Sequence, residues 1–224
     1  MLSPLKFEAR KLIPIYSLVI CGLSSLLLFA LQAKKAPLLI PNEKVFPEKA
    51  QSLQSSYWGL NFLYIGPDKD SIYIHKESYF PELRKRSSSL MNKRLKEAAQ
   101  NEIEFQVLNH QIIKIAISQE ALYFPEKQEQ QSPAYPILIR NLSPDSIRIG
   151  LNHYLRVQLE MIENENWIPL NRFNTFGCGV GIGQIALGPG EIAISALPLY
   201  ENLKPGKYRL HLEPNLHSNS FEIQ

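Results

Sequence analysis

The sequence predicts a mainly β protein, an antiparallel β-sandwich preceded by one N-terminal transmembrane helix, a tether, and a hairpin with a short helix. An apolar run without a charged residue lies between Lys11 and Lys34 and has the length of a bilayer. From residue 102 onward, short segments rich in branched and aromatic residues alternate with Gly, Pro and Asn turns. Because no long helical pattern separates these segments, we expect antiparallel sheets.

Composition is that of a folded globular chain with little net charge. Hydrophobic residues make up 45% of the 224 residues and charged residues 20%. The formal net charge is +3. Residues 1–33 carry +2 of it, from Lys6, Arg10 and Lys11 against Glu8, which leaves +1 for the remainder. A nearly balanced chain offers no basic face, so we expect no nucleic-acid partner.

We expect four segments along the chain. They are a cationic segment and transmembrane signal anchor over residues 1–33, a tether over 34–56, a hairpin and helical segment over 57–101, and a β-sandwich domain over 102–224. Domains commonly hold about 100–150 residues, so the last segment is long enough to bury a core of its own.

The anchor runs from Leu12 to Ala33. As a helix it would span about 33 Å, at about 1.5 Å per residue, against a hydrocarbon core of about 30 Å. Membrane lipid is therefore the expected partner of residues 12–33. A cleaved signal peptide is the alternative, but the candidate site Leu31-Gln32-Ala33 has a large residue where a small one is needed. We expect an uncleaved single-pass protein whose C-terminal domain lies outside the cytoplasm, in the periplasm or the extracellular space.

The segments that follow the anchor have distinct local patterns. Prolines at 37, 41 and 47 exclude a regular helix in the tether. Residues 58–65 and 71–75 are aromatic and branched, and turn residues lie between them, which predicts a hairpin. A run rich in Lys, Arg, Leu and Ala after Pro81 predicts a helix to Gln100. The basic residues in 84–96 are expected to face solvent, and contact with anionic lipid is the alternative.

Beyond residue 102 the chain consists of expected strands and turns. Residues 154–160 alternate between polar and apolar side chains, as a half-buried antiparallel strand does. A polar loop is expected over 126–133. The expected strands are 105–108, 112–117, 123–124, 135–140, 146–149, 154–162, 167–170, 192–197, 207–212 and 221–223.

One stretch near the C-terminus resembles the L-x-P-G-x-Y entry to the penultimate strand of fibronectin-type and immunoglobulin-like domains. It reads Leu203-Lys204-Pro205-Gly206-Lys207-Tyr208-Arg209-Leu210. The path from Tyr154 to Glu160, through Trp167 and Gly188-Pro189-Gly190 to Tyr208, is similar to bacterial immunoglobulin-like domains of exported envelope proteins, and the resemblance covers about residues 135–224. The resemblance implies a β-sandwich at the cell envelope, a tyrosine corner at Tyr208 and no catalytic residues. Cys21 and Cys178 are not the paired core cysteines of antibody domains.

The sequence contains no pattern with catalytic, cofactor or metal-binding spacing. Gly177 to Gly183 contains G-x-G-x-G, but Pro189 follows too soon for the helix that a dinucleotide site requires, so a loop between strands is expected. Cys178 has no charged or His neighbour to activate it. The acidic residues around Glu160 are expected to form a soluble face. The histidines form no metal-binding motif, and they are His75, His110, His153, His211 and His217.

We therefore predict no catalytic, cofactor-binding or metal-binding residues, no cofactor and no enzyme activity. The expected function is that of a membrane-anchored, non-catalytic envelope protein whose immunoglobulin-like domain serves protein–protein interaction or structural scaffolding, with a protein partner at the envelope. The alternative is an extracytoplasmic module that binds a small ligand or a glycan. That alternative requires exposed aromatic side chains and carboxylates grouped on one edge of the domain.

We predict that the mature protein keeps residues 12–33 as its membrane anchor, because an uncharged run of bilayer length partitions stably into lipid. The chain should remain in the membrane pellet after an alkaline wash, and N-terminal sequencing should begin before Leu12. A mature N-terminus near residue 34 would contradict the uncleaved anchor.

Overall fold

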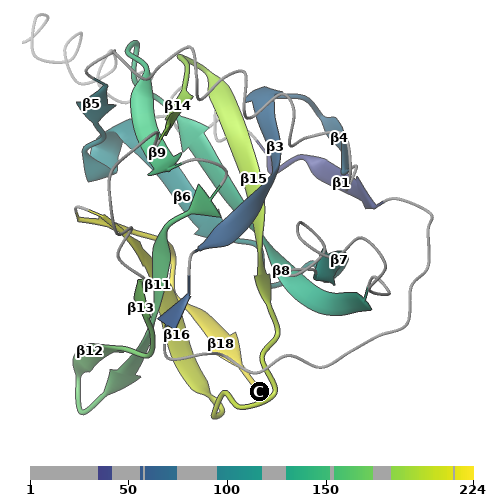
Figure 1. Cartoon of the computed structure of the whole chain (residues 1–224), viewed down its shortest axis with the longest axis vertical. Coiled ribbons are helices and arrows are strands. Elements are labelled where there is room, and N and C mark those ends of the chain that lie inside the picture. Colours follow the sequence, from purple (N-terminus) through teal and green to yellow (C-terminus); the bar gives the residue numbers. More distant parts are fainter. Residues whose placement is uncertain are drawn as a thin grey trace, which may run out of the picture. The chain divides into compact units, whose positions relative to one another are not determined.

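The computed structural model describes residues 35–41, 56–57, 59–74, 95–117, 130–151, 154–173, 183–213 and 215–224. The chain divides into two compact units, Met1–Ala36 and Pro37–Gln224, and every described strand belongs to the second (Figure 1). The described part is mainly β and contains no α-helix, which confirms the predicted fold class at that level. None of its helical segments is long and apolar enough to cross a membrane, and the expected anchor at residues 12–33 lies outside the described residues.

The larger sheet has the strand order β14-β9-β10-β3-β15-β8-β6, with β5 added to β9 and β7 added to β8. Its pairs are antiparallel except β5 with β9. Its strands are β3 (Leu60–Pro67), β5 (Lys96–Glu97), β6 (Ile103–Val107), β7 (Ile113–Ile117), β8 (Gln130–Asn141), β9 (Ile147–Leu151), β10 (Tyr154–Leu155), β14 (Gln184–Leu187) and β15 (Glu191–Pro198). A short 3-10 helix, η2 (Gln100–Glu102), precedes β6.

The smaller sheet has the order β12-β11-β16-β17, and β18 also pairs with β16. β11 and β12 form a hairpin whose turn places Asn164 and Glu165 at positive φ of 48° and 66°. The strands are β11 (Val157–Glu163), β12 (Asn166–Pro169), β16 (Gly206–Leu212), β17 (Leu216–His217) and β18 (Phe221–Ile223). Two short parallel pairs complete the described strands, β1 (Leu38–Pro41) with β4 (Ser71–Ile74) and β2 (Ser56–Tyr57) with β13 (Arg172–Phe173).

The chain passes from one sheet to the other at Arg156. β10 ends at Leu155 and pairs with β3 and β9 in the larger sheet, whereas β11 begins at Val157 and pairs with β12 and β16 in the smaller one. The single strand expected over 154–162 is therefore two strands. Its alternation persists across the break, because Leu155, Val157 and Leu159 are all buried.

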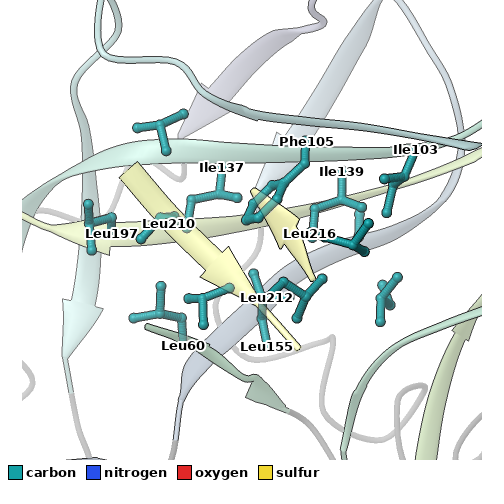
Figure 2. Packing of buried hydrophobic residues seen from close by; sticks show 14 of the residues in the cluster. Leu60, Ile103, Phe105, Ile137, Ile139, Leu155, Leu197, Leu210, Leu212 and Leu216 are labelled. Atoms are coloured by element: carbon teal, nitrogen blue, oxygen red, sulfur yellow. The ribbon is translucent and has the colours of Figure 1, made fainter. Parts of the chain in front are cut away.

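The main hydrophobic core draws on both sheets. Figure 2 shows Leu210, Leu212 and Leu216 of the smaller sheet with Phe105, Ile137 and Ile139 of the larger one, all of them members of the same buried cluster. On β16 the buried residues alternate with more exposed ones, as the two-residue strand period requires. β15 shows no alternation because nearly every one of its residues is buried, so this strand is covered on both faces.

Tyr208 forms the tyrosine corner that the resemblance implies. Its side chain has no solvent exposure, and its hydroxyl donates a hydrogen bond to the backbone carbonyl of Lys204. The ring stacks on Phe221 of β18, with ring centroids 6.1 Å apart. Tyr208 therefore has the two features that a tyrosine corner requires, a buried ring and a hydroxyl bonded to upstream backbone.

The expected hairpin over 58–75 does not form, although both of its strands exist. β3 pairs with β10 at Leu60 and Asn61 and with β15 from Phe62 to Pro67, whereas β4 pairs in parallel with β1. The turn between them is tied to the sheet, because Asp68 accepts a hydrogen bond of 2.8 Å from the Nε of buried Arg140 on β8. Arg140 also pairs with Glu104 of β6.

Several boundaries differ from the expectation. β8 begins at Gln130, inside the loop expected over 126–133, because residues 130–134 pair with β7. Lys96 and Glu97, expected at the end of a helix, form β5 on the edge of β9. The ends of the expected tether include β1 and β2. The part of the expected helix from residue 82 to residue 94 and the expected strand at 123–124 lie outside the described residues.

Replacing Tyr208 by Phe should destabilise the domain by about 1 kcal/mol or slightly more, because the Lys204 carbonyl loses its donor inside the turn. The measurement is the denaturant midpoint at unchanged slope. Tyr73→Phe is the matched control, since that side chain is 64% exposed, and it should leave the midpoint nearly unchanged. Equal midpoints for wild type and Tyr208→Phe would contradict the stabilising role of the corner.

Candidate functional site

The outer face of the smaller sheet carries a cluster of polar and aromatic side chains. Since Tyr208, Leu210 and Leu212 of β16 are buried, Arg209 and His211 between them point to the opposite face. Strand register places Glu160 of β11 directly opposite Arg209, and His217 of β17 directly opposite His211. Three neighbouring strands therefore contribute to one patch.

Glu160 and Arg209 form the central ion pair of this patch. The Nε of Arg209 donates to Oε2 of Glu160 at 2.6 Å, and the carboxylate side chain is only 9% exposed. The Arg209 guanidinium also lies over the ring of Trp167 on β12, 4.3 Å from its centroid. A cation over an indole ring contributes about 0.5–2 kcal/mol, depending on its burial. Arg209 is thus held by a carboxylate and by an aromatic face together.

His211 and His217 complete the cluster on the other side of Glu160. Their rings stack, with centroids 4.8 Å apart and an interplanar angle of 19°. The Nδ1 of His211 lies 3.6 Å from Oε1 of Glu160, whereas the Nε of Arg209 binds the other carboxylate oxygen, Oε2. One donor atom from each of Glu160, His211 and His217 lies within 4.8 Å of the other two.

The backbone of His217 is fixed on both sides. Its N–H donates to Oε1 of Gln100 at 2.8 Å, and its carbonyl accepts from Nε2 of the same side chain at 3.1 Å. The next residue, Ser218, bonds to the backbone of Leu210 through its N–H and its hydroxyl. His217 is therefore held rigidly beside β16 even though β17 is a very short strand.

Burial lowers the pKa of His217, and the positive charge of Arg209 and then the neighbouring His211 lower it further, while the carboxylate of Glu160 acts in the opposite direction. A half-buried imidazole beside a guanidinium favours its neutral form. At neutral pH the cluster thus presents a neutral imidazole next to a compensated ion pair.

The sequence does not single out this cluster, and the expectation that Glu160 lies on a soluble face is wrong, because this residue is buried. His110, by contrast, is exposed in the turn that follows β6. His75, His153, Cys178 and nearly all of the G-x-G-x-G stretch lie outside the described residues. β13 and β14 precede and follow that stretch along the chain.

A second feature is a depression of about 610 Å³ beside β18. Tyrosines and carboxylates gather there, together with apolar and amide side chains. Burial raises the pKa of the Tyr200 phenol well above its usual value, so this hydroxyl stays protonated and acts as a hydrogen-bond donor at any physiological pH. The residues that line the depression include Asn109, Tyr135, Tyr200, Glu201 and Glu222.

We predict that domain stability falls as the pH is lowered from about 7.5 through the ordinary His pKa of about 6.5. The pKa of His217 is depressed in the folded state, so the unfolded chain takes up the proton first and is favoured at lower pH. In metal-free buffer, His217→Gln should show a flatter profile of unfolding free energy in this window, whereas His110→Gln, at an exposed site, should keep the wild-type slope. Identical slopes for all three proteins would refute the assignment to His217.

Comparison of the chain with protein-family models, with curated proteins and with solved structures found no match.

Proposed function

We propose that this chain is a membrane-anchored, non-catalytic envelope protein whose immunoglobulin-like β-sandwich serves protein–protein interaction or scaffolding. In this proposal residues 12–33 anchor it in lipid as a single pass, and the domain lies outside the cytoplasm. The observation that carries the fold assignment is the strand order of the two sheets. In immunoglobulin-like sandwiches one sheet has the order A-B-E-D and the other the order C′-C-F-G.

The order β6-β8-β15-β3 corresponds to A-B-E-D, and β12-β11-β16-β18 corresponds to C′-C-F-G. The chain order of the strands agrees for A, B, C, C′, E, F and G, and β3 occupies the position of D although it precedes β6 along the chain. The buried Tyr208 on β16, two residues after Gly206, supports the same assignment because the tyrosine corner belongs to strand F. The strands β9, β10 and β14 extend the sheet beyond this arrangement.

The support for an interaction role comes from the surface of the smaller sheet, because sandwiches carry many functions and the fold does not select one of them. Trp167 and Ile162 are register partners on the outer face of the β11–β12 hairpin, and Ile162 is 36% exposed. The guanidinium of Arg209, on β16, lies over the ring of Trp167. Tryptophan and arginine are enriched among residues that dominate binding energy in interfaces. This face of the smaller sheet is therefore our candidate for the protein-binding surface.

The test is site-specific photo-crosslinking in native membranes. A photoreactive residue at position 162 should give one adduct of discrete mass, since a bound partner would cover the hairpin. The matched control is position 142, where Leu142 is 58% exposed on the turn after β8 and should give none. The adduct at 162 should be lost in Trp167→Ala and reduced when residues 1–33 are removed. No adduct at 162, or the same adduct from both positions, would refute this surface.

The depression beside β18 favours a second candidate, a module that binds a small ligand or a glycan. Tyrosine rings provide stacking surfaces, and carboxylates and amides accept and donate hydrogen bonds to sugar hydroxyls, which is the grouping that such a site requires. A screen of the full chain against immobilised oligosaccharides, with Glu222→Gln as the variant, separates this candidate from the first.

A further inference from the structure

We propose that Glu160, His211 and His217 form a binding site for a divalent transition-metal ion, with Zn²⁺ as the best fit. The ligands would be one carboxylate oxygen and two imidazole nitrogens from β11, β16 and β17. The inference is independent of the interaction surface proposed above, because it depends only on the contacts among these side chains.

The first support is geometric. The three donor atoms already lie within 4.8 Å of one another. With metal–ligand bonds of about 2.0–2.2 Å, tetrahedral ligands stand roughly 3.4 Å apart, so each atom has to move by about 1 Å. Side-chain rotation supplies such a movement, and the stacked imidazoles have to turn so that their nitrogens converge.

The backbone that carries the ligands needs no movement. Register fixes His211 against His217, and the Gln100 amide fixes the outer edge of His217. Glu160 is diagonal to His211 across the β11–β16 pair, since its direct partner is Arg209. Diagonal neighbours of this kind lie within reach of long side chains. The site is therefore preorganised at the level of the sheet.

The positive charge of Arg209 would repel a bound metal ion, but the contacts of its guanidinium limit this repulsion. Its guanidinium binds Oε2 of Glu160 and lies over Trp167 on β12, across β11 from the histidines. Oε1 of Glu160 is the oxygen that faces His211. A carboxylate that binds a metal through one oxygen commonly accepts a hydrogen bond on the other, and Arg209 would provide it here.

The donor set selects the class of ion. Two imidazoles and one carboxylate suit Zn²⁺, and other imidazole-preferring ions such as Cu²⁺ and Ni²⁺ belong to the same class. Ca²⁺ and Mg²⁺ prefer oxygen ligands only, so they do not fit. Three protein ligands leave a fourth position, which water would occupy because His211 and His217 are only half-buried on the outer face.

The test measures Zn²⁺ binding to the purified full chain by titration calorimetry at pH 7.5, and absorption spectroscopy of the Co²⁺-loaded chain reports the coordination geometry. We expect one Zn²⁺ per chain at this site and a tetrahedral Co²⁺ spectrum. His211→Gln and His217→Gln should each weaken binding at least about tenfold. His110→Gln is the matched control, because His110 is exposed in the turn after β6, and this variant should bind Zn²⁺ as the wild type does.

Thermal unfolding provides a second readout that also reports whether each variant folds. Zn²⁺ should raise the unfolding midpoint of the wild type and of His110→Gln, because it binds only the folded site. At the same Zn²⁺ concentration it should raise the midpoints of His211→Gln and His217→Gln by less than that of the wild type, although both variants should unfold cooperatively without metal. The proposal is overturned if the wild type takes up no stoichiometric Zn²⁺, or if uptake is unchanged in the two variants.

Discussion

The two-residue period of strand β16 is the constraint on which the rest of the structure depends. One face of this strand inserts Tyr208, Leu210 and Leu212 into the core, and each is nearly or fully buried. The other face must then present Arg209 and His211 on the outside of the sheet. The same strand pairs with β11, β17 and β18, so it sets the register of the whole smaller sheet. The buried core residues and the surface cluster on β16 both follow from the orientation of this one strand in its sheet.

Side-chain amides complete the hydrogen bonding where strands are short or end early. Asn219 binds both the N–H and the carbonyl of Val107, and thereby joins the segment before β18 to the free edge of β6. Gln100 binds His217 in the same two-sided way. Buried Asn141 donates to the carbonyls of Leu187 and Gly188. A buried backbone group without a partner costs about 1–3 kcal/mol, and the Leu187 carbonyl, whose bond from Asn141 is buried, is the group in this set to which that cost applies most directly.

The sequence predicts most of the fold where one face of a strand is buried and the other is not. Alternation identifies β11 and β16, and turn residues mark the ends of β9 and β15. Which strands pair with each other is harder to predict from the sequence, because pairing depends on the strands that lie nearby in the folded chain. Sequence proximity favours β3 with β4, yet β3 pairs with β10 and β15 while β4 pairs with β1. Two-residue strands such as β5 and β13 have no periodicity to detect, since only their neighbours define them.

The cluster could not be predicted because two strand registers bring it together. Histidines and a carboxylate on separate strands have no characteristic spacing in sequence, and Glu160 meets His211 only through the pairing of Glu160 with Arg209. A shift of β16 by one residue would turn Arg209 and His211 inward and Tyr208 outward. Burial of Tyr208, with its hydroxyl bonded to Lys204, opposes that shift. The residue that a sequence motif does identify is therefore the one that holds the unpredicted cluster in place, and weakening the corner should loosen the histidine pair along with the core.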